Sequence, residues 1–288
     1  MGCAANNYQF YQRFCLQIIN IKDKTNMTPV FFFFVFGLII GSFLNVVIYR
    51  MNTARSLSGR SACMSCQNKL CWYELIPLFS FFGLQGRCRN CKAKISIQYP
   101  LVEFVTGLIF LSLFLKFRNI FFFSLPIFSI TYLYYALMFS LLIVITIYDL
   151  RHKIIPDVLS FTFDVLAFIG LFFFTNSIFY GFSPHIPSFF EFLSGLLVAL
   201  PFALLWLVSR GVWMGFGDAK LALGLGWFLG LSMGFSALVL AFWIGAVVGL
   251  GLVIFSKKYG FKSEIPFAPY LILGTLLVFI FNFNLFNF

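Results

Sequence analysis

Charged residues are scarce in this sequence, and acidic residues are the scarcest. Only 10% of the 288 residues are charged, and nine Asp and Glu stand against twenty Lys and Arg. The two histidines are too few for a site built from several imidazoles, and no Ser/His or Cys/His arrangement pairs a nucleophile with a base. A chain with so few polar side chains is not an ordinary soluble domain.

Apolar residues take the place of the missing charges. The chain is 61% hydrophobic and contains 44 Phe. Several uninterrupted apolar runs reach the roughly 20 residues that a helix needs to cross a bilayer. The runs are continuous rather than alternating, which excludes the strands of a transmembrane barrel. The sequence therefore predicts an all-α polytopic membrane protein in contact with a lipid bilayer.

The excess of basic residues indicates how the protein is oriented in the membrane rather than that it binds nucleic acid. A formal net charge of +11 would favour a nucleic-acid partner in a soluble protein. Here the basic residues fall mainly in short loops between apolar runs, where they set the orientation of a membrane protein. We therefore expect no nucleic-acid partner, and we expect the most basic loops to be cytoplasmic.

The apolar runs divide the chain into four parts. Residues 1–29 form a polar tail without the apolar core of a signal peptide, and the natural start is left open between Met1 and Met27, which directly precedes the first run. A first transmembrane helix over 30–49, a basic segment over 50–100 and a seven-helix membrane domain over 101–288 follow. About eight transmembrane helices result, with both termini outside. The last seven are expected near residues 101–117, 127–148, 156–174, 191–209, 219–231, 234–256 and 266–286.

Small and polar residues in the first two helices predict close contacts. Gly37 and Gly41 are four residues apart, a spacing that lets two helices approach closely. An Asn inside the membrane is most often a hydrogen bond between helices, and we assign Asn45 that role. Pro100 opens the second helix, and Glu103 is expected in its first turn, where the helix dipole favours an acid.

The basic segment 50–100 contains two C-x-x-C pairs. Cys63 with Cys66 and Cys88 with Cys91 are separated by 21 residues, slightly more than in the usual zinc ribbon, and Cys71 is left over. Eight basic residues against one acid place the segment in the cytoplasm, where thiols stay reduced. We therefore predict a small cytoplasmic zinc-ribbon-like domain between helices 1 and 2, with the four paired cysteines as zinc ligands. The alternative is a reduced thiol cluster without metal.

Two aspartates lie where apolar runs meet loops. Asp149 ends the run 127–148, and Asp218 follows Gly215 and Gly217 between the runs 192–209 and 221–256. An ionised carboxylate is costly there unless it is used or paired. Two such acids close together suit acid/base hydrolysis, since mutual repulsion keeps one protonated and the other ionised. The simpler alternative is a Gly-rich turn in which Asp218 caps the next helix.

Two further aspartates lie in the fourth helix. Asp157 stands at its N-terminus and is expected to act as a cap or as a supporting group rather than as a catalyst. Asp164 lies deeper in the helix and is expected to face the interior of the bundle.

The order of these motifs resembles the bacterial type IV prepilin peptidase and N-methyltransferase family, a Gly-x-Gly-Asp type of aspartic protease. The resemblance extends over most of residues 37–274. It rests on the following stretches: 41–50, the two cysteine pairs, 87–96, Tyr99–Glu103, Asp149 with 155–157, 215–220 and 265–270. Two departures are Ala268, where the family usually has Gly, and the absence of Pro between Cys63 and Cys66.

The resemblance implies a substrate, a methyl donor and a set of site residues. The substrates would be type IV prepilins and pseudopilins, including those of type II secretion, with a basic leader that ends in Gly before an apolar helix beginning with Phe. Asp149 and Asp218 would cleave after the Gly at the cytoplasmic face of the bacterial inner membrane. The supporting residues would be Gly215, Gly217, Lys220 and Asp157. The new amine would be methylated from S-adenosylmethionine, whose binding residues the sequence does not identify.

Three other functions fit parts of the sequence. A peptidase without methyltransferase activity would share both aspartates, but the intact segment 50–100 argues against it. A proton- or ion-coupled transporter would need acids in mid-membrane, where only Asp164 clearly lies. A zinc-stapled scaffold would leave the two membrane-edge aspartates unexplained.

Overall fold

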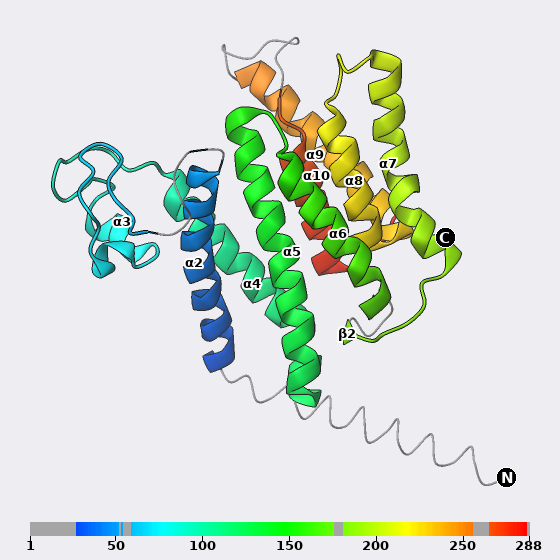
Figure 1. Cartoon of the computed structure of the whole chain (residues 1–288), viewed down its shortest axis with the longest axis horizontal. Coiled ribbons are helices and arrows are strands. Elements are labelled where there is room, and N and C mark those ends of the chain that lie inside the picture. Colours follow the sequence, from blue (N-terminus) through cyan, green and yellow to red (C-terminus); the bar gives the residue numbers. More distant parts are fainter. Residues whose placement is uncertain (1–26, 52, 54–58, 176–180, 256–264, 287–288) are drawn as a thin grey trace, which may run out of the picture.

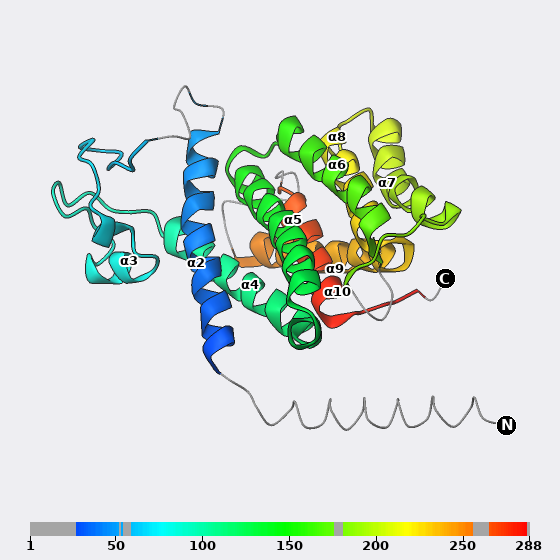
Figure 2. The same cartoon turned by 60° about the horizontal axis from the view of Figure 1, so that its bottom comes forward.

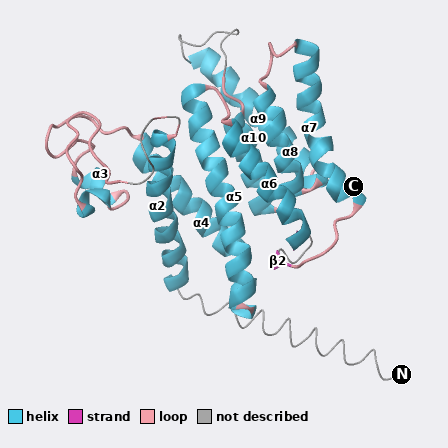
Figure 3. Ribbon diagram, viewed as in Figure 1, coloured by secondary structure: helices cyan, strands magenta, loops and turns pink. Residues whose placement is uncertain are grey.

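The computed structural model describes residues 27–51, 53, 59–175, 181–255 and 265–286. Within that part of the chain the structure is a bundle of eight principal helices, drawn in cyan in Figure 3. They are α2 (Met27–Arg50), α4 (Gln98–Phe123), α5 (Leu125–His152), α6 (Asp157–Phe173), α7 (Phe189–Ser209), α8 (Phe216–Leu229), α9 (Leu231–Phe255) and α10 (Ala268–Phe281). The predicted fold class is confirmed. The expected tail before Met27 and the basic loop at Lys257, Lys258 and Lys262 lie outside the described residues.

Helix boundaries differ from the expected ones mainly at polar ends. α5 continues to His152, because Lys153 closes it in a left-handed conformation with its N–H on the Asp149 carbonyl at 2.7 Å. Asp149 therefore lies inside the last turn rather than after the helix. α4 likewise begins at Gln98, so that Glu103 is not in its first turn, and the expected interaction of Glu103 with the helix dipole is wrong.

The helices fall into two length classes. Five are long and apolar enough to cross a membrane, which makes this a multi-pass membrane protein: α2, α4, α5, α7 and α9. α6 has 17 residues, and α8 and α10 have 14 each. A 14-residue helix is about 21 Å long, short of the roughly 30 Å hydrocarbon thickness. The short helices therefore depend on packing against the long ones.

The α2–α4 pair shows the predicted close approach. A Cβ at Gly37 would come within 2.8 Å of the Gly107 Cα, and one at Gly41 within 2.8 Å of the Glu103 Cα. Asn45 donates from Nδ2 to the Tyr99 carbonyl at 3.1 Å, so the predicted hydrogen bond between helices is confirmed.

Glycines also bring α8 against its neighbours. A Cβ at Gly226 would meet the Gly195 Cα of α7 at 2.7 Å, and one at Gly224 would collide with the Asp164 carboxylate of α6. Ser194 fixes the α7–α8 contact by donating to the Gly226 carbonyl at 2.9 Å. Gly230, with φ of 78°, ends α8 directly before α9.

Aromatic rings fill the centre of the bundle around α5, the most buried of the long helices. Tyr135 and Phe139 of α5 pack on Phe228 of α8 and Phe279 of α10, with ring centroids 4.8–5.7 Å apart. This packing joins the short helices α8 and α10 to the central one.

One side of the bundle gathers the ends that concern function. The C-terminal ends of α5 and α7 and the N-terminal ends of α6, α8 and α10 lie at the top of Figure 1. At the opposite side, the short strands β1 (Phe174–Thr175) and β2 (Gly181–Phe182) pair antiparallel, a hairpin that the sequence did not predict.

The basic segment between α2 and α4, which we call the cysteine segment, lies outside the bundle, beside α2 (Figures 1 and 2). It contains the 3₁₀ helix η1 (Trp72–Leu75) and the short helix α3 (Phe79–Gly83), and its remaining described residues are mostly loop. Because α2 ends at Arg50 and α4 begins at Gln98, the segment is tied at both ends to transmembrane helices.

Candidate functional site

Asp149 is held in a buried position at the end of the central helix. Its side chain is 4% exposed, and the backbone N–H of Ala268 hydrogen-bonds to its carboxylate. Ala268 begins α10, so the carboxylate faces the positive end of that helix dipole. Its Oδ2 has no hydrogen-bond partner among the described residues. A buried carboxylate oxygen without a partner is unusual and calls for a functional explanation.

Asp218 reaches the same region from the first turn of α8. The start of α8 lies against the α5–α6 turn, because Gly217 has no side chain: a Cβ there would be 3.1 Å from the Ile155 Cβ. The charge of Asp149 acts on Asp218, which places the two carboxylates within electrostatic range of each other. The structure thus brings together the two acids that the sequence singled out.

Gly215 and Gly217 differ in what surrounds them. Gly215 precedes α8 as its N-cap with an ordinary φ of −71°, and the atom nearest to a Cβ added there would be the Gly217 nitrogen at 4.0 Å. Packing therefore favours a glycine at 217, whereas a Cβ at 215 would meet no side chain. No side-chain cap at the start of α8 comes from Asp218, so the alternative of Asp218 as N-cap is wrong.

Lys220 and Asp157 form an ion pair across the α6–α8 contact. Lys220 Nζ lies 2.7 Å from Asp157 Oδ1, and the two side chains are 40% and 78% exposed. The N-cap of α6 is Pro156, and no side chain caps that helix end, so the prediction that Asp157 could act as a cap is wrong. Its alternative role, as a supporting group, agrees with the ion pair.

Asp164 faces α8, as predicted. Its Oδ1 lies against Gly224 without a hydrogen-bond partner in the described residues. Lys220, one turn earlier on α8, acts on it electrostatically. Lys220 thus interacts with two acids of α6, directly with Asp157 and at longer range with Asp164.

The four predicted cysteine ligands lie together. Their sulfur atoms are all within 4.8 Å of one another, and the Cys63 and Cys91 sulfurs are 3.7 Å apart. Disulfide sulfurs would be about 2.0 Å apart, whereas four sulfurs around one tetrahedral ion at 2.3 Å would be about 3.8 Å apart. The cluster therefore fits a single metal ion.

The two knuckles repeat the same backbone geometry. In the first, the Cys63 N–H donates to Asn68 and the Gln67 N–H donates back to Cys63; in the second, Cys88 does the same with Ala93 and Lys92. The residues after the second cysteine of each pair, Gln67 and Lys92, both have positive φ, 56° and 58°. This repeated turn aims both pairs of thiols at one point.

Two of the thiols titrate differently. The backbone N–H groups of Cys66 and Ser65 lower the pKa of Cys63 to about 6. The Ala93 N–H lowers the pKa of Cys91, but desolvation and the neighbouring thiols outweigh it and raise that pKa to about 11. A cluster with one thiol already ionised near neutral pH is suited to a cation.

Comparison with known proteins assigns the family. Residues 35–117 match the description "Bacterial Peptidase A24 N-terminal domain", and residues 136–250 match the "Type IV leader peptidase family". The second match contains both aspartates, and the first contains the cysteine segment. This chain belongs to the type IV leader peptidase family. The resemblance noted in the sequence is confirmed.

Several relatives of the type IV leader peptidase family cover most of the chain, and each is named a prepilin leader peptidase/N-methyltransferase. One from Myxococcus xanthus is 38% identical over 82% of this chain and 67% of its own length. One from Bacillus subtilis is 31% identical over 88% and 95%, and one from Vibrio cholerae is 30% identical over 86% and 94%. No solved structure matches the chain.

Sequence reasoning missed one contact near Asp149 in this family member. Arg151, half a turn further along α5, lies over the Tyr49 ring at 4.0 Å and donates to the Tyr49 hydroxyl. Its Nε donates to Gln98 Oε1 at 2.6 Å. Tyr49 in turn stacks on Tyr99 at 4.8 Å. We call these four residues the arginine clasp; it joins α5 to the ends of α2 and α4.

A second missed contact joins the cysteine segment to the bundle. Glu103 is buried between α2 and α4, where its Oε2 accepts from the Leu78 N–H at 2.9 Å and its carboxylate interacts with the Ser42 hydroxyl. Leu78 lies between η1 and α3 with a φ of 61°. The only sequence signal for this role was an acid inside an apolar run.

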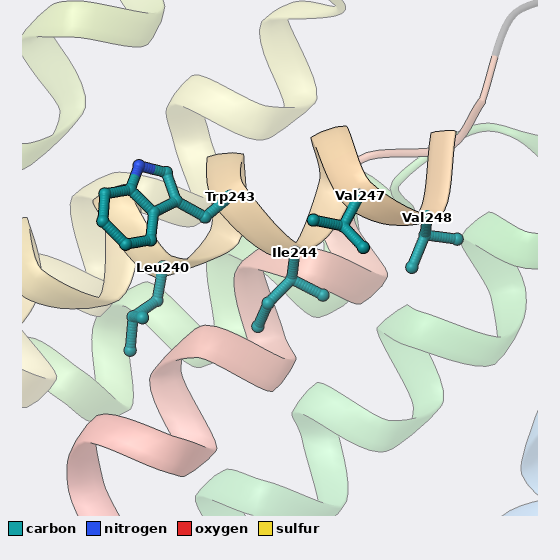
Figure 4. A pocket seen from close by; sticks show the side chains of 5 residues that line it. All are labelled: Leu240, Trp243, Ile244, Val247 and Val248. Carbon is teal, nitrogen blue, oxygen red and sulfur yellow. The ribbon is translucent and has the colours of Figure 1, made fainter. Parts of the chain in front are cut away.

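An open hollow on α9 has none of this chemistry. It encloses about 260 Å³ and is lined only by Leu240, Trp243, Ile244, Val247 and Val248 (Figure 4). All five lie on one helix face and none is polar, so this surface suits acyl chains rather than a reaction.

Proposed function

We propose that this chain cleaves the leader of type IV prepilins and pseudopilins after its terminal Gly and then methylates the new N-terminal Phe. The observation that supports this most directly is the approach of Asp149 and Asp218 at one side of the bundle, each beside the N-terminus of a short helix. The enzymatic activities in the names of the relatives agree with it.

In the proposed hydrolysis the two carboxyl groups share the acid and base roles. The ionised one takes a proton from water, which attacks the scissile carbonyl carbon. The protonated one hydrogen-bonds to the carbonyl oxygen, and a proton passes to the leaving amine nitrogen as the C–N bond breaks. Asp149 and Asp218 act as one coupled unit, so neither alone is the acid or the base of the free enzyme.

The open backbone before α8 suits an extended substrate. Gly215 borders free space, and Trp213 beside it is 72% exposed. We place the residues around the scissile bond along this strip, with the apolar pilin helix in the membrane and the basic leader outside it. Gly217 and the Lys220–Asp157 pair then hold the start of α8 in place.

The second activity needs a methyl donor and a separate region of the chain. S-adenosylmethionine would supply the methyl group: the freed amine nitrogen would bond to the methyl carbon as the bond from that carbon to the donor sulfur breaks, releasing S-adenosylhomocysteine and one proton. We place the donor near the cysteine segment, by analogy with the family. Zinc, bound by Cys63, Cys66, Cys88 and Cys91, would hold the two knuckles of that segment together, a structural role for a site with four protein ligands.

We place both aspartates and the cysteine segment on the cytoplasmic side of the bacterial inner membrane. The segment starts and ends beside the C-terminal end of α5, because Arg151 contacts Tyr49 of α2 and Gln98 of α4, and it carries the largest basic excess in the chain.

The test is incubation of the purified protein with a prepilin, with and without S-adenosylmethionine, and mass analysis of the products. The proposal requires a mature pilin cut after the leader Gly, and one added methyl group only when the donor is present. Cleavage without methylation in the presence of donor would restrict the chain to a peptidase, and an intact prepilin would contradict the proposal.

A further inference from the structure

The cysteine segment carries large apolar side chains on its surface. Trp72 is 77% exposed on η1, and Phe79 and Phe82 are 75% and 71% exposed on α3. These two elements contact each other, so the three rings lie on neighbouring parts of the segment. On α9, exposures of 66% at Trp243 and 72% at Val247 mark a face turned to lipid. The three exposed rings of the cysteine segment lie outside the transmembrane helices, so their exposure needs an explanation of its own. Contact with lipid, as on α9, is one.

The part of the segment that carries these rings lies alongside the transmembrane helix α2 and not beyond its end. In Figures 1 and 2, α3 lies beside α2 and below the Arg50 end of that helix. The contact of Glu103 with the Leu78 N–H fixes the joint between η1 and α3 against the α2–α4 pair. A built polar contact, rather than a flexible tether, therefore sets the height of the exposed rings.

Positive charge adjoins these rings. A cavity of about 480 Å³ begins at Gly83, the last residue of α3, and contains three cations and no acid among its lining residues. These residues are Gly83, Leu84, Gln85, Arg87, Arg89 and Lys92. Apolar rings beside clustered cations are the combination with which peripheral segments bind anionic membrane surfaces.

We propose that η1 and α3 insert Trp72, Phe79 and Phe82 into the membrane surface beside α2, and that Arg87, Arg89 and Lys92 bind the phosphates of anionic lipids there. The basic leader of a pilin precursor would be repelled by the same three cations. The proposal requires only that the helices beside the segment span the membrane, and it is independent of the proposed catalytic function.

The test places the full-length protein in nanodiscs, with fluorine-labelled tryptophan as the probe. The Trp72 resonance is assigned by its loss in Trp72→Phe, and Trp243 serves as the lipid-exposed reference. Spin labels on the acyl chains should broaden the Trp72 resonance as they do that of Trp243, and a water-soluble gadolinium chelate should not. Broadening of Trp72 by the chelate alone would overturn the proposal. Protection from both reagents would also overturn it, in favour of a protein contact.

The cations are tested separately with spin-labelled phosphatidylglycerol and phosphatidylcholine. The triple variant Arg87→Gln, Arg89→Gln, Lys92→Gln should lower the preference of Trp72 for the anionic lipid by about 150-fold, since each cation near an anionic surface contributes about 1 kcal/mol and the three together about 3 kcal/mol. The variant Arg60→Gln, Lys69→Gln, Lys94→Gln removes the same charge outside the cavity and should change it much less. Equal effects of the two variants would contradict a lipid site in the cavity.

Discussion

At the scale of single residues, the two positions before Asp218 are glycine for different physical reasons. Gly217 allows α8 to meet the α5–α6 turn, while Gly215 leaves the backbone open on the side where we place the substrate. The same motif therefore combines a packing requirement and an access requirement, which sequence alone does not separate.

Substitution by alanine should separate these two requirements. Gly217→Ala places its Cβ 3.1 Å from that of Ile155 and should lower the free energy of unfolding by about 1–3 kcal/mol. Gly215→Ala should change it by less than about 0.5 kcal/mol, because nothing is displaced. Thermal unfolding of the purified variants measures both. A larger loss for Gly215→Ala than for Gly217→Ala would contradict this account of the α8 start.

The Lys220–Asp157 ion pair is too exposed to solvent to contribute much to the stability of the protein. We expect Asp157→Asn to lower the free energy of unfolding by at most about 1 kcal/mol and to leave most of the prepilin cleavage, since exposed ion pairs contribute little. Lys220→Gln is the matched control, and the double variant should show that the two effects are not additive. Complete loss of cleavage in Asp157→Asn would move this residue into the catalytic site.

At the scale of elements, the arginine clasp connects the helix that carries Asp149 to the helices that flank the cysteine segment. Arg151 contacts Tyr49 of α2 and Gln98 of α4 through a planar group that lysine cannot imitate. The end of α5 is therefore held from outside the aspartate pair.

A double-mutant cycle tests the clasp. Arg151→Lys and Tyr49→Leu should each destabilise the protein, and their coupling energy should be about 0.5–1 kcal/mol, typical of an exposed cation–π contact. Lys153→Arg on the adjoining turn is the control for altered basic residues at this helix end. A coupling energy of zero would mean that the two side chains contribute independently.

We expect a single metal ion to hold the two cysteine knuckles together. Metal analysis should find about one zinc per chain, and Cys88→Ser should lower that content and loosen the segment. Cys71→Ser is the matched control, because Cys71 is an exposed thiol outside the four-sulfur cluster. Full metal content after replacement of all four cluster cysteines would rule out this site.

Sequence patterns predicted the elements better than their joints. Apolar runs gave the eight helices, and Gly37, Gly41 and Asn45 correctly indicated how the first two pack, because such small or polar residues have few other uses in a membrane. The contacts of Glu103 and Arg151 could not be predicted, since their partners lie far along the chain or on other helices. The cap expected at Asp157 failed because α6 begins at that residue, which leaves the N-cap position to Pro156.

At the scale of the whole molecule, the aspartates and the cysteines occupy different parts of one side. Asp149 and Asp218 lie among α5, α8 and α10, whereas the cysteine segment projects beside α2 (Figure 1). Cleavage requires a substrate held between two carboxylates, while methylation requires only the freed amine near the donor. We therefore expect mutation to separate the two activities.

The most direct test of this account uses Asp149→Asn and Asp218→Asn, each folded and inserted as the parent protein. Each variant is given an uncut prepilin and, separately, a pilin already cut after the leader Gly, both with S-adenosylmethionine. Product masses should show no cleavage of the first and one added methyl group on the second. Near-normal cleavage by either variant would remove that aspartate from the mechanism. Failure to methylate the cut pilin, in a variant that still binds the donor, would show that the two sites are one.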